Sequence, residues 1–245
     1  MDGLLRCTRY AFGPNRLHYC GPDANREILA YLDAGITDPG LASMLTKFET
    51  LYPYLKLIAD ANQIRDPFDD RVVEAYWLGN ELLENVSRRR FFRHLEDGLQ
   101  LRKKMTTFEL ENVTAPLGYG ALPHHSYHVF SVWKRTGNTG TAHTIESIDA
   151  CRISWGTVTA VEGPKISVLR RPIINISGSL TLGEPSPITI ARPLDCRDDI
   201  EEVEPGQIIT MHWDVPCEVI SARQMKHLEY YTSLHLRLAE RAVKT

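Results

Sequence analysis

The sequence has no apolar run long enough to cross a membrane and no secretion signal. A membrane-spanning helix needs roughly 20 consecutive apolar residues, and the longest runs here fall well short of that. Residues 1–10 lack the basic start and the apolar centre of a signal peptide. We therefore expect the protein in the cytoplasm, with no membrane partner.

An excess of positive charge is also missing. The formal net charge is −3 in 245 residues, and hydrophobic residues make up 43% of the chain. General attraction to nucleic acid needs a basic surface, and disorder needs a more polar composition. The composition argues against a basic-patch nucleic-acid-binding protein and predicts a folded chain that buries its own core.

Motifs for nucleotide chemistry and for common hydrolases are absent. The sequence contains no phosphate-binding Gly-rich loop, no Cys-x-x-Cys pair, no His-Glu-x-x-His helix and no Gly-x-Ser-x-Gly elbow. These absences argue against a kinase, an ATPase or a dehydrogenase.

Cysteine is scarce, and the number of cysteines is odd. A chain of this size does not depend on disulfides, so in a reducing compartment we expect free thiols that serve as core residues or metal ligands. The five cysteines are Cys7, Cys20, Cys151, Cys196 and Cys217.

What is present predicts an α+β fold that begins with a helical domain, residues 1–112. Apolar residues recur there at intervals of three and four, which is helical spacing. Asp23 and Asp38, the latter followed by Pro39, are predicted to start helices. Pro53 is expected to break or kink the helix that contains it.

Residues 113–149 form a predicted linker, and residues 150–245 form a small OB-like β-barrel with a C-terminal helix. The linker holds a His-rich loop and an alternating segment, residues 127–134, typical of a strand. Short β-branched segments separated by turns follow and predict the barrel. These segments are residues 153–161, 165–169, 173–176, 188–191, 207–213 and 217–220. One apolar stripe along residues 222–244 predicts the closing helix.

The predicted barrel resembles the HypC family of NiFe-hydrogenase maturation chaperones. In residues 151–158 (CRISWGTV), a cysteine is followed five residues later by a glycine and then by a strand valine, as in that family. Residues 204–219 (EPGQIITMHWDVPCEV) are similar to its segment of glycine, strand, histidine, short turn and strand. The resemblance covers about residues 151–240 and leaves the helical half unrecognised.

The resemblance implies two metal ligands, Cys151 and His212. In the family the matching residues are implicated in holding the iron fragment that becomes Fe(CN)2CO, so the implied cofactor is transient iron. The implied partners are a hydrogenase large-subunit precursor or a maturation scaffold protein. Independently of the family, thiolate is a soft, strongly donating ligand and neutral imidazole suits iron.

The chain departs from the family pattern in three ways. Cys151 is internal and follows Ala150, whereas the family's cysteine becomes N-terminal after Met removal. Trp155 stands where the family usually has proline. The stretch between Cys151 and His212 is longer by about a hairpin, which we place at residues 177–187. The alternative interpretation is a core cysteine and a hydrogen-bonded barrel histidine.

A second candidate metal site lies in the linker, at His124, His125 and His128. Three imidazoles within five residues suggest ligands, and His143 follows the next loop. On a strand these side chains would not share a face, so a metal site requires a bent loop. The alternative is a set of hydrogen-bonded loop histidines.

A third candidate is the pair His18 and Cys20, next to a Gly-Pro turn. The predicted helix start at Asp23 would stabilise a Cys20 thiolate through the positive end of the helix dipole, and His18 could share its proton or a metal. The alternative is a turn that anchors the N-terminal segment.

These sites lead to three hypotheses. The first is an accessory protein of NiFe-hydrogenase assembly that handles an iron fragment and is not itself an enzyme. The second is a metalloenzyme with a site at the domain junction, built from Cys20, His124, His125 and His128. The third is an interaction module without metal.

Overall fold

The first half of the chain is helical, as the apolar spacing predicts. The computed structural model describes residues 1–132, 144–192 and 203–243, with side chains as far as residue 240. Its early elements are α1 (Gly3–Arg16), α2 (Asn25–Ala34), α3 (Pro39–Leu45), α4 (Leu51–Ala61), α5 (Asp70–Trp77), η1 (Glu81–Asn85), α6 (Arg88–Arg93), η2 (His94–Gly98), α7 (Leu101–Lys104), α8 (Thr107–Thr114) and η3 (Ala115–Tyr119).

Helix starts were predicted with mixed success. Asp38 caps α3 by accepting a hydrogen bond from the Leu41 amide, and Pro39 lies in the first turn. The prediction for Asp23 is wrong, because Ala24 occupies the N-cap of α2. The predicted break at Pro53 is also wrong, since this residue lies in the first turn of α4, where its missing N–H costs no helical hydrogen bond.

The strand predicted at residues 127–134 is wrong over the described residues. This segment forms α9 (His125–Tyr127) and a π-helical turn, η4 (His128–Val132). Almost every side chain from His124 to Val132 is buried, so the apparent alternation did not separate an inner face from an outer one. A further helix, α10 (Ile145–Cys151), precedes the strands.

The strands form an antiparallel sheet with the order β5-β2-β1-β6-β7, and β3 and β4 form a separate hairpin. Their bounds are β1 (Ser154–Glu162), β2 (Lys165–Arg170), β3 (Ile173–Ile176), β4 (Ser179–Leu182), β5 (Ser186–Ala191), β6 (Ile208–His212) and β7 (Val215–Ile220). No ladder among the described residues joins β5 to β7, so closure into a barrel remains a prediction.

The extra hairpin expected at residues 177–187 is found slightly earlier in the chain, as β3 and β4, and β4 itself was not predicted. Its turn contains Ser177 and Gly178, both with positive φ (53° and 90°). Two successive residues of this kind match the twist of an antiparallel pair.

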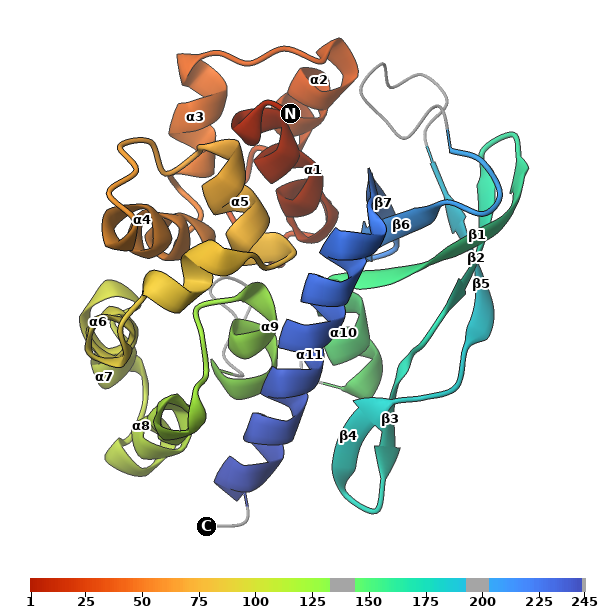
Figure 1. The fold of residues 1–245 in the computed structure, drawn as a ribbon. Coiled ribbons are helices and arrows are strands. Elements are labelled where there is room, and N and C mark those ends of the chain that lie inside the picture. Colours follow the sequence, from red (N-terminus) through yellow and green to blue (C-terminus); the bar gives the residue numbers. More distant parts are fainter. Residues whose placement is uncertain (133–143, 193–202, 244–245) are drawn as a thin grey trace.

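The C-terminal helix α11 (Ala222–Val243) runs between the helical half and the strands (Figure 1). The C-terminal helix is present as predicted, and its main contacts are with α9, η3, η4 and β4. The apolar stripe is real, but the linker helices cover it. None of the described helices is long and apolar enough to cross a bilayer.

A single buried apolar cluster extends across both halves of the chain. It includes Tyr10 and Tyr54 from the helical half, Cys217 from β7, and Leu228 and Tyr231 from α11. Helix α1 also packs directly on β6 and β7. The two halves therefore share the core that positions the site described below.

Candidate functional site

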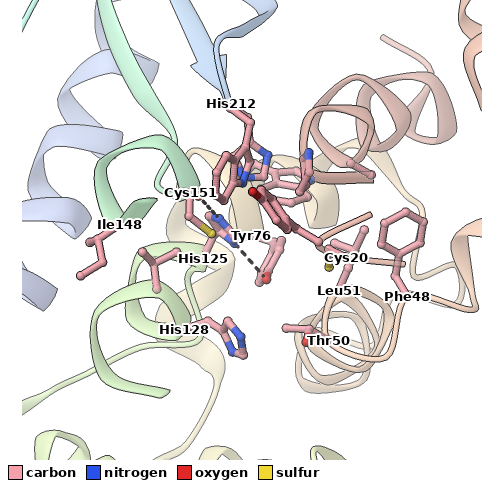
Figure 2. A pocket seen from close by; sticks show the side chains of 16 residues that line it. Cys20, Phe48, Thr50, Leu51, Tyr76, His125, His128, Ile148, Cys151 and His212 are labelled. Atoms are coloured by element: carbon pink, nitrogen blue, oxygen red, sulfur yellow. Dashed lines mark hydrogen bonds between the residues drawn. The ribbon is translucent and has the colours of Figure 1, made fainter. Parts of the chain in front are cut away.

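A pocket lies where the ends of α10 and β6 meet α9 and the first helices (Figure 2). Its cavity is about 60 Å³, enough for an ion with a few small ligands or for several waters. The walls are mostly apolar and include Phe48, Leu51, Trp77 and Val129. Both halves of the chain contribute to it.

Three potential metal ligands converge at this pocket: His125, Cys151 and His212. One ligand atom from each lies within 4.8 Å of the others. Cys151 and His212 are the two residues that the sequence resemblance singled out. His125 belongs to the separate linker cluster, so the structure combines two candidate sites into one.

Local backbone contacts explain why Cys151 and His212 meet. The Trp213 amide, next to His212, donates a 2.9 Å hydrogen bond to the carbonyl of Ala150, next to Cys151. Helix α1 presses on the other side at Gly13, where a Cβ would lie 2.3 Å from the His212 carbonyl oxygen. Only glycine permits this approach.

His212 has one ring nitrogen anchored and the other available. Its Nδ1 lies 2.6 Å from the carbonyl oxygen of Tyr10, and because a carbonyl only accepts, Nδ1 carries the hydrogen. Within the described part of the chain, Nε2 is buried and makes no hydrogen bond. Burial lowers the pKa of His212 to about 4, against the opposing effect of the Tyr10 and Cys151 carbonyls, so Nε2 presents a lone pair at neutral pH.

Both ring nitrogens of His125 are engaged. Nε2 donates to the Cys151 carbonyl at 2.8 Å, and Nδ1 lies 3.2 Å from the Tyr76 hydroxyl, which must then be the donor. Burial and, after it, the neighbouring ring of His212 hold the pKa of His125 well below its ordinary value. His125 is therefore a neutral imidazole whose hydrogen lies on Nε2.

Cys151 is the last residue of α10, at the negative end of the helix dipole. Nucleophilic cysteines are usually activated at helix N-termini or beside a cation. The helix end therefore disfavours a bare thiolate at Cys151. A metal ion at this point would compensate that effect and use the thiolate as a ligand.

Aromatic rings hold the two histidines in place. The Trp77 ring lies 4.6 Å from the His125 ring and 5.5 Å from the His212 ring, centroid to centroid. Burial keeps the pKa of Tyr76 well above its ordinary value, so its hydroxyl stays protonated. Sequence reasoning missed Tyr10, Tyr76 and Trp77, because nothing local in the sequence shows that these residues contact the site.

Neither of the other two histidines predicted at the linker site belongs to the three-donor cluster. His124 faces α11, where its Nδ1 lies 2.7 Å from the Ser126 hydroxyl and that hydroxyl lies 2.7 Å from Nδ1 of His235. His128 lines the pocket beside Tyr54, with ring centroids 5.8 Å apart. The His143 and Cys196 positions lie outside the described residues.

Cys20 lines the pocket as well, so the predicted convergence of the Cys20 turn with the histidine segment is found. Its predicted thiolate character is wrong, because burial raises the pKa of Cys20 to about 12. His18 is exposed and faces Asp23, with Nδ1 3.3 Å from the carboxylate. His18 and Cys20 therefore do not form a site in the structure.

The whole chain, residues 1–245, matches the family described as "Family of unknown function (DUF6390)". No curated protein and no solved structure matches it.

Proposed function

The chain belongs to the DUF6390 family, whose description gives no activity, and we propose from the site alone that it holds a transition-metal ion on Cys151 and His212, iron in the first place. Two observations carry this proposal. Nε2 of His212 is buried without a hydrogen bond in the described chain, and a ring nitrogen of His212 lies within 4.8 Å of the Cys151 sulfur in a pocket with room for an ion.

The donor set fits such an ion. Thiolate and imidazole together favour iron, zinc or copper over magnesium or calcium. Metal-binding histidines usually donate their second N–H to a carbonyl or carboxylate, which fixes the tautomer and orients the ring. The Tyr10 carbonyl does this for His212. When bound, the ion would supply Lewis acidity or open positions for small ligands.

We propose further that the bound iron is cargo in NiFe-hydrogenase assembly, passed to a large-subunit precursor or a maturation scaffold. The support is the resemblance around Cys151 and His212, together with the proximity of these two side chains. A cytoplasmic location and closure of the sheet into a barrel are parts of the same proposal. Strands β5 and β7 support closure, since their Cα atoms approach within 8 Å.

A metalloenzyme with a resident ion is the second candidate. A third donor, His125, favours it, because catalytic metal sites commonly combine three protein ligands with one open position. The site of this candidate differs from the junction site expected from the sequence, since His124 faces α11.

One experiment tests the proposal and separates the candidates. The protein is loaded with Fe²⁺ without oxygen, challenged with a chelator, and mixed with a tagged hydrogenase large-subunit precursor. The assembly role predicts one weakly held iron per chain and capture by the precursor. Retention against the chelator without capture would favour the enzyme, and no iron in either assay would contradict both.

A further inference from the structure

The three donors of the pocket are not equally ready to bind a metal. Figure 2 shows His125 between Cys151 and Tyr76, with its hydrogen bonds drawn as dashed lines. Nε2 of His212 is free of hydrogen bonds within the described chain, whereas Nε2 of His125 is occupied by its own hydrogen. The acceptor of that hydrogen is the carbonyl of Cys151, the neighbouring donor residue.

The donors also come from different parts of the fold. Cys151 ends α10 and His212 ends β6, and the Trp213–Ala150 hydrogen bond ties these two ends together. His125 begins α9, a helix that packs against α11. The pair is therefore prepared by local backbone contacts, and the third donor is brought by another element.

We propose that His125 is a conditional third ligand, which joins a metal already held by Cys151 and His212 by giving up its hydrogen bond to the Cys151 carbonyl. This inference rests on the proposed function. Binding of His125 converts a two-donor carrier site into a three-donor site. When the hydrogen bond to the Cys151 carbonyl re-forms, the metal is again held by two donors only.

The proton balance of this change is simple. The Cys151 thiol releases one proton to solvent when its sulfur becomes a ligand. At His125 the proton on Nε2 leaves and one is taken up at Nδ1, so the ring stays neutral. The Tyr76 hydroxyl, a donor to Nδ1 before the change, then serves as its acceptor. No electrons move, and one proton in total leaves per metal ion.

Titration with Co²⁺ alone, followed by absorption, tests the inference on the full chain. The His125→Gln variant keeps an N–H group for the Cys151 carbonyl and lacks the ring nitrogen. It should keep the thiolate-to-cobalt band, lose at least about tenfold in Co²⁺ affinity and change its d–d band. Tyr76→Phe keeps the ring and removes the acceptor for Nδ1, so it should lose affinity by a smaller factor.

His18→Gln is the control, since His18 is an exposed histidine that does not line the pocket. Its Co²⁺ affinity and spectrum should equal those of the wild type. If the His125 and Tyr76 variants also equal the wild type, while the wild type shows the thiolate band, the third-ligand inference is overturned and the proposed function stands. If the wild type shows no thiolate band, the proposed function fails and the inference with it.

Discussion

At the scale of single residues, the proposed metal binding depends on the sulfur of Cys151. We predict that Cys151→Ser lowers metal affinity by more than tenfold while the melting temperature changes little, because a hydroxyl fills the space of the thiol and is a poor ligand for a soft metal. Metal titration and thermal unfolding measure the two effects.

Cys7→Ser is the matched control for this variant. Cys7 is fully buried in the core, and burial raises the pKa of its thiol far above the ordinary range. The extra polar group should cost about 1–3 kcal/mol of stability and leave metal affinity unchanged. If Cys151→Ser behaves like Cys7→Ser, with a clear loss of stability and unchanged hydrogenase maturation, Cys151 is a core residue and the chaperone proposal ends.

The buried histidines lead to a second prediction, which concerns the pH dependence of stability. Burial lowers the pKa of His94 and His124 to about 3 and that of His212 to about 4. Between these values and the ordinary pKa, about 6.5, the unfolded chain binds more protons than the folded one. The contribution of these neutral histidines to the free energy of unfolding is therefore fully present above about pH 6.5. It is lost as the pH falls toward 4.

The expected loss is up to about 1.4 kcal/mol per pH unit for each such histidine. Urea unfolding of the metal-free protein at a series of pH values between 7 and 5 measures it. A free energy of unfolding that stays constant over this range would contradict the buried, neutral state assigned to these side chains.

At the scale of elements, α9 is fixed by the hydroxyl of Ser126. This hydroxyl bridges Nδ1 of His124 and Nδ1 of His235, and so ties α9 to α11. We predict that Ser126→Ala destabilises the protein by about 1–3 kcal/mol, because it leaves the buried Nδ1 of His235 without its partner. Chemical denaturation measures this loss.

Ser43→Ala, at an exposed position in α3, serves as its control and should change stability by less than about 0.5 kcal/mol. Equal effects of the two variants would show that the Ser126 bridge is not a structural link. A fall in metal affinity for Ser126→Ala alone would be consistent with α9 carrying the third donor.

Helices and strands were predictable from the sequence where the residue pattern was compatible with only one type of secondary structure. The Asp38-Pro39 start, the strand segments after Cys151 and the long C-terminal helix have such patterns, and the structure contains all three. The segment at residues 127–134 failed because a helix buried on all sides shows no reliable period. The side chains that contact the site could not be predicted, for a different reason. Tyr10 and His212 are far apart in sequence, and only the packing of α1 on β6 brings them together.

At the scale of the whole molecule, a buried ion pair joins the first helix to the last strand. Arg6 is 4% exposed, and its Nε lies 3.1 Å from the Glu218 carboxylate. We predict that Arg6→Met costs about 3–5 kcal/mol, because Glu218 would stay buried without its cation. Removing both partners in Arg6→Met/Glu218→Leu should recover part of that loss.

The exposed pair of Arg71 and Asp69 gives the comparison. Arg71 is 67% exposed, so Arg71→Met should change the free energy of unfolding by less than about 1 kcal/mol. Equal losses for Arg6→Met and Arg71→Met would mean that the buried pair does not hold α1 against β7.

The shared core leads to one more prediction at this scale. Residues 150–245 expressed alone should not fold stably, because Cys217, Leu228 and Tyr231 would lose the helical side chains that cover them. Circular dichroism and denaturant unfolding of this fragment test the point. A cooperative transition in the fragment would support the sequence-based division into a helical domain and an independent barrel.

The atoms around a bound ion show directly whether Cys151 and His212 hold a metal. X-ray absorption on the full chain loaded with one equivalent of Zn²⁺ reports the atoms around the ion. We predict one sulfur at about 2.3 Å and imidazole nitrogen at about 2.0 Å, with the sulfur absent in Cys151→Ser. A shell of oxygen and nitrogen alone in the wild type, or a sulfur that persists in Cys151→Ser, would show that Cys151 is not a metal ligand.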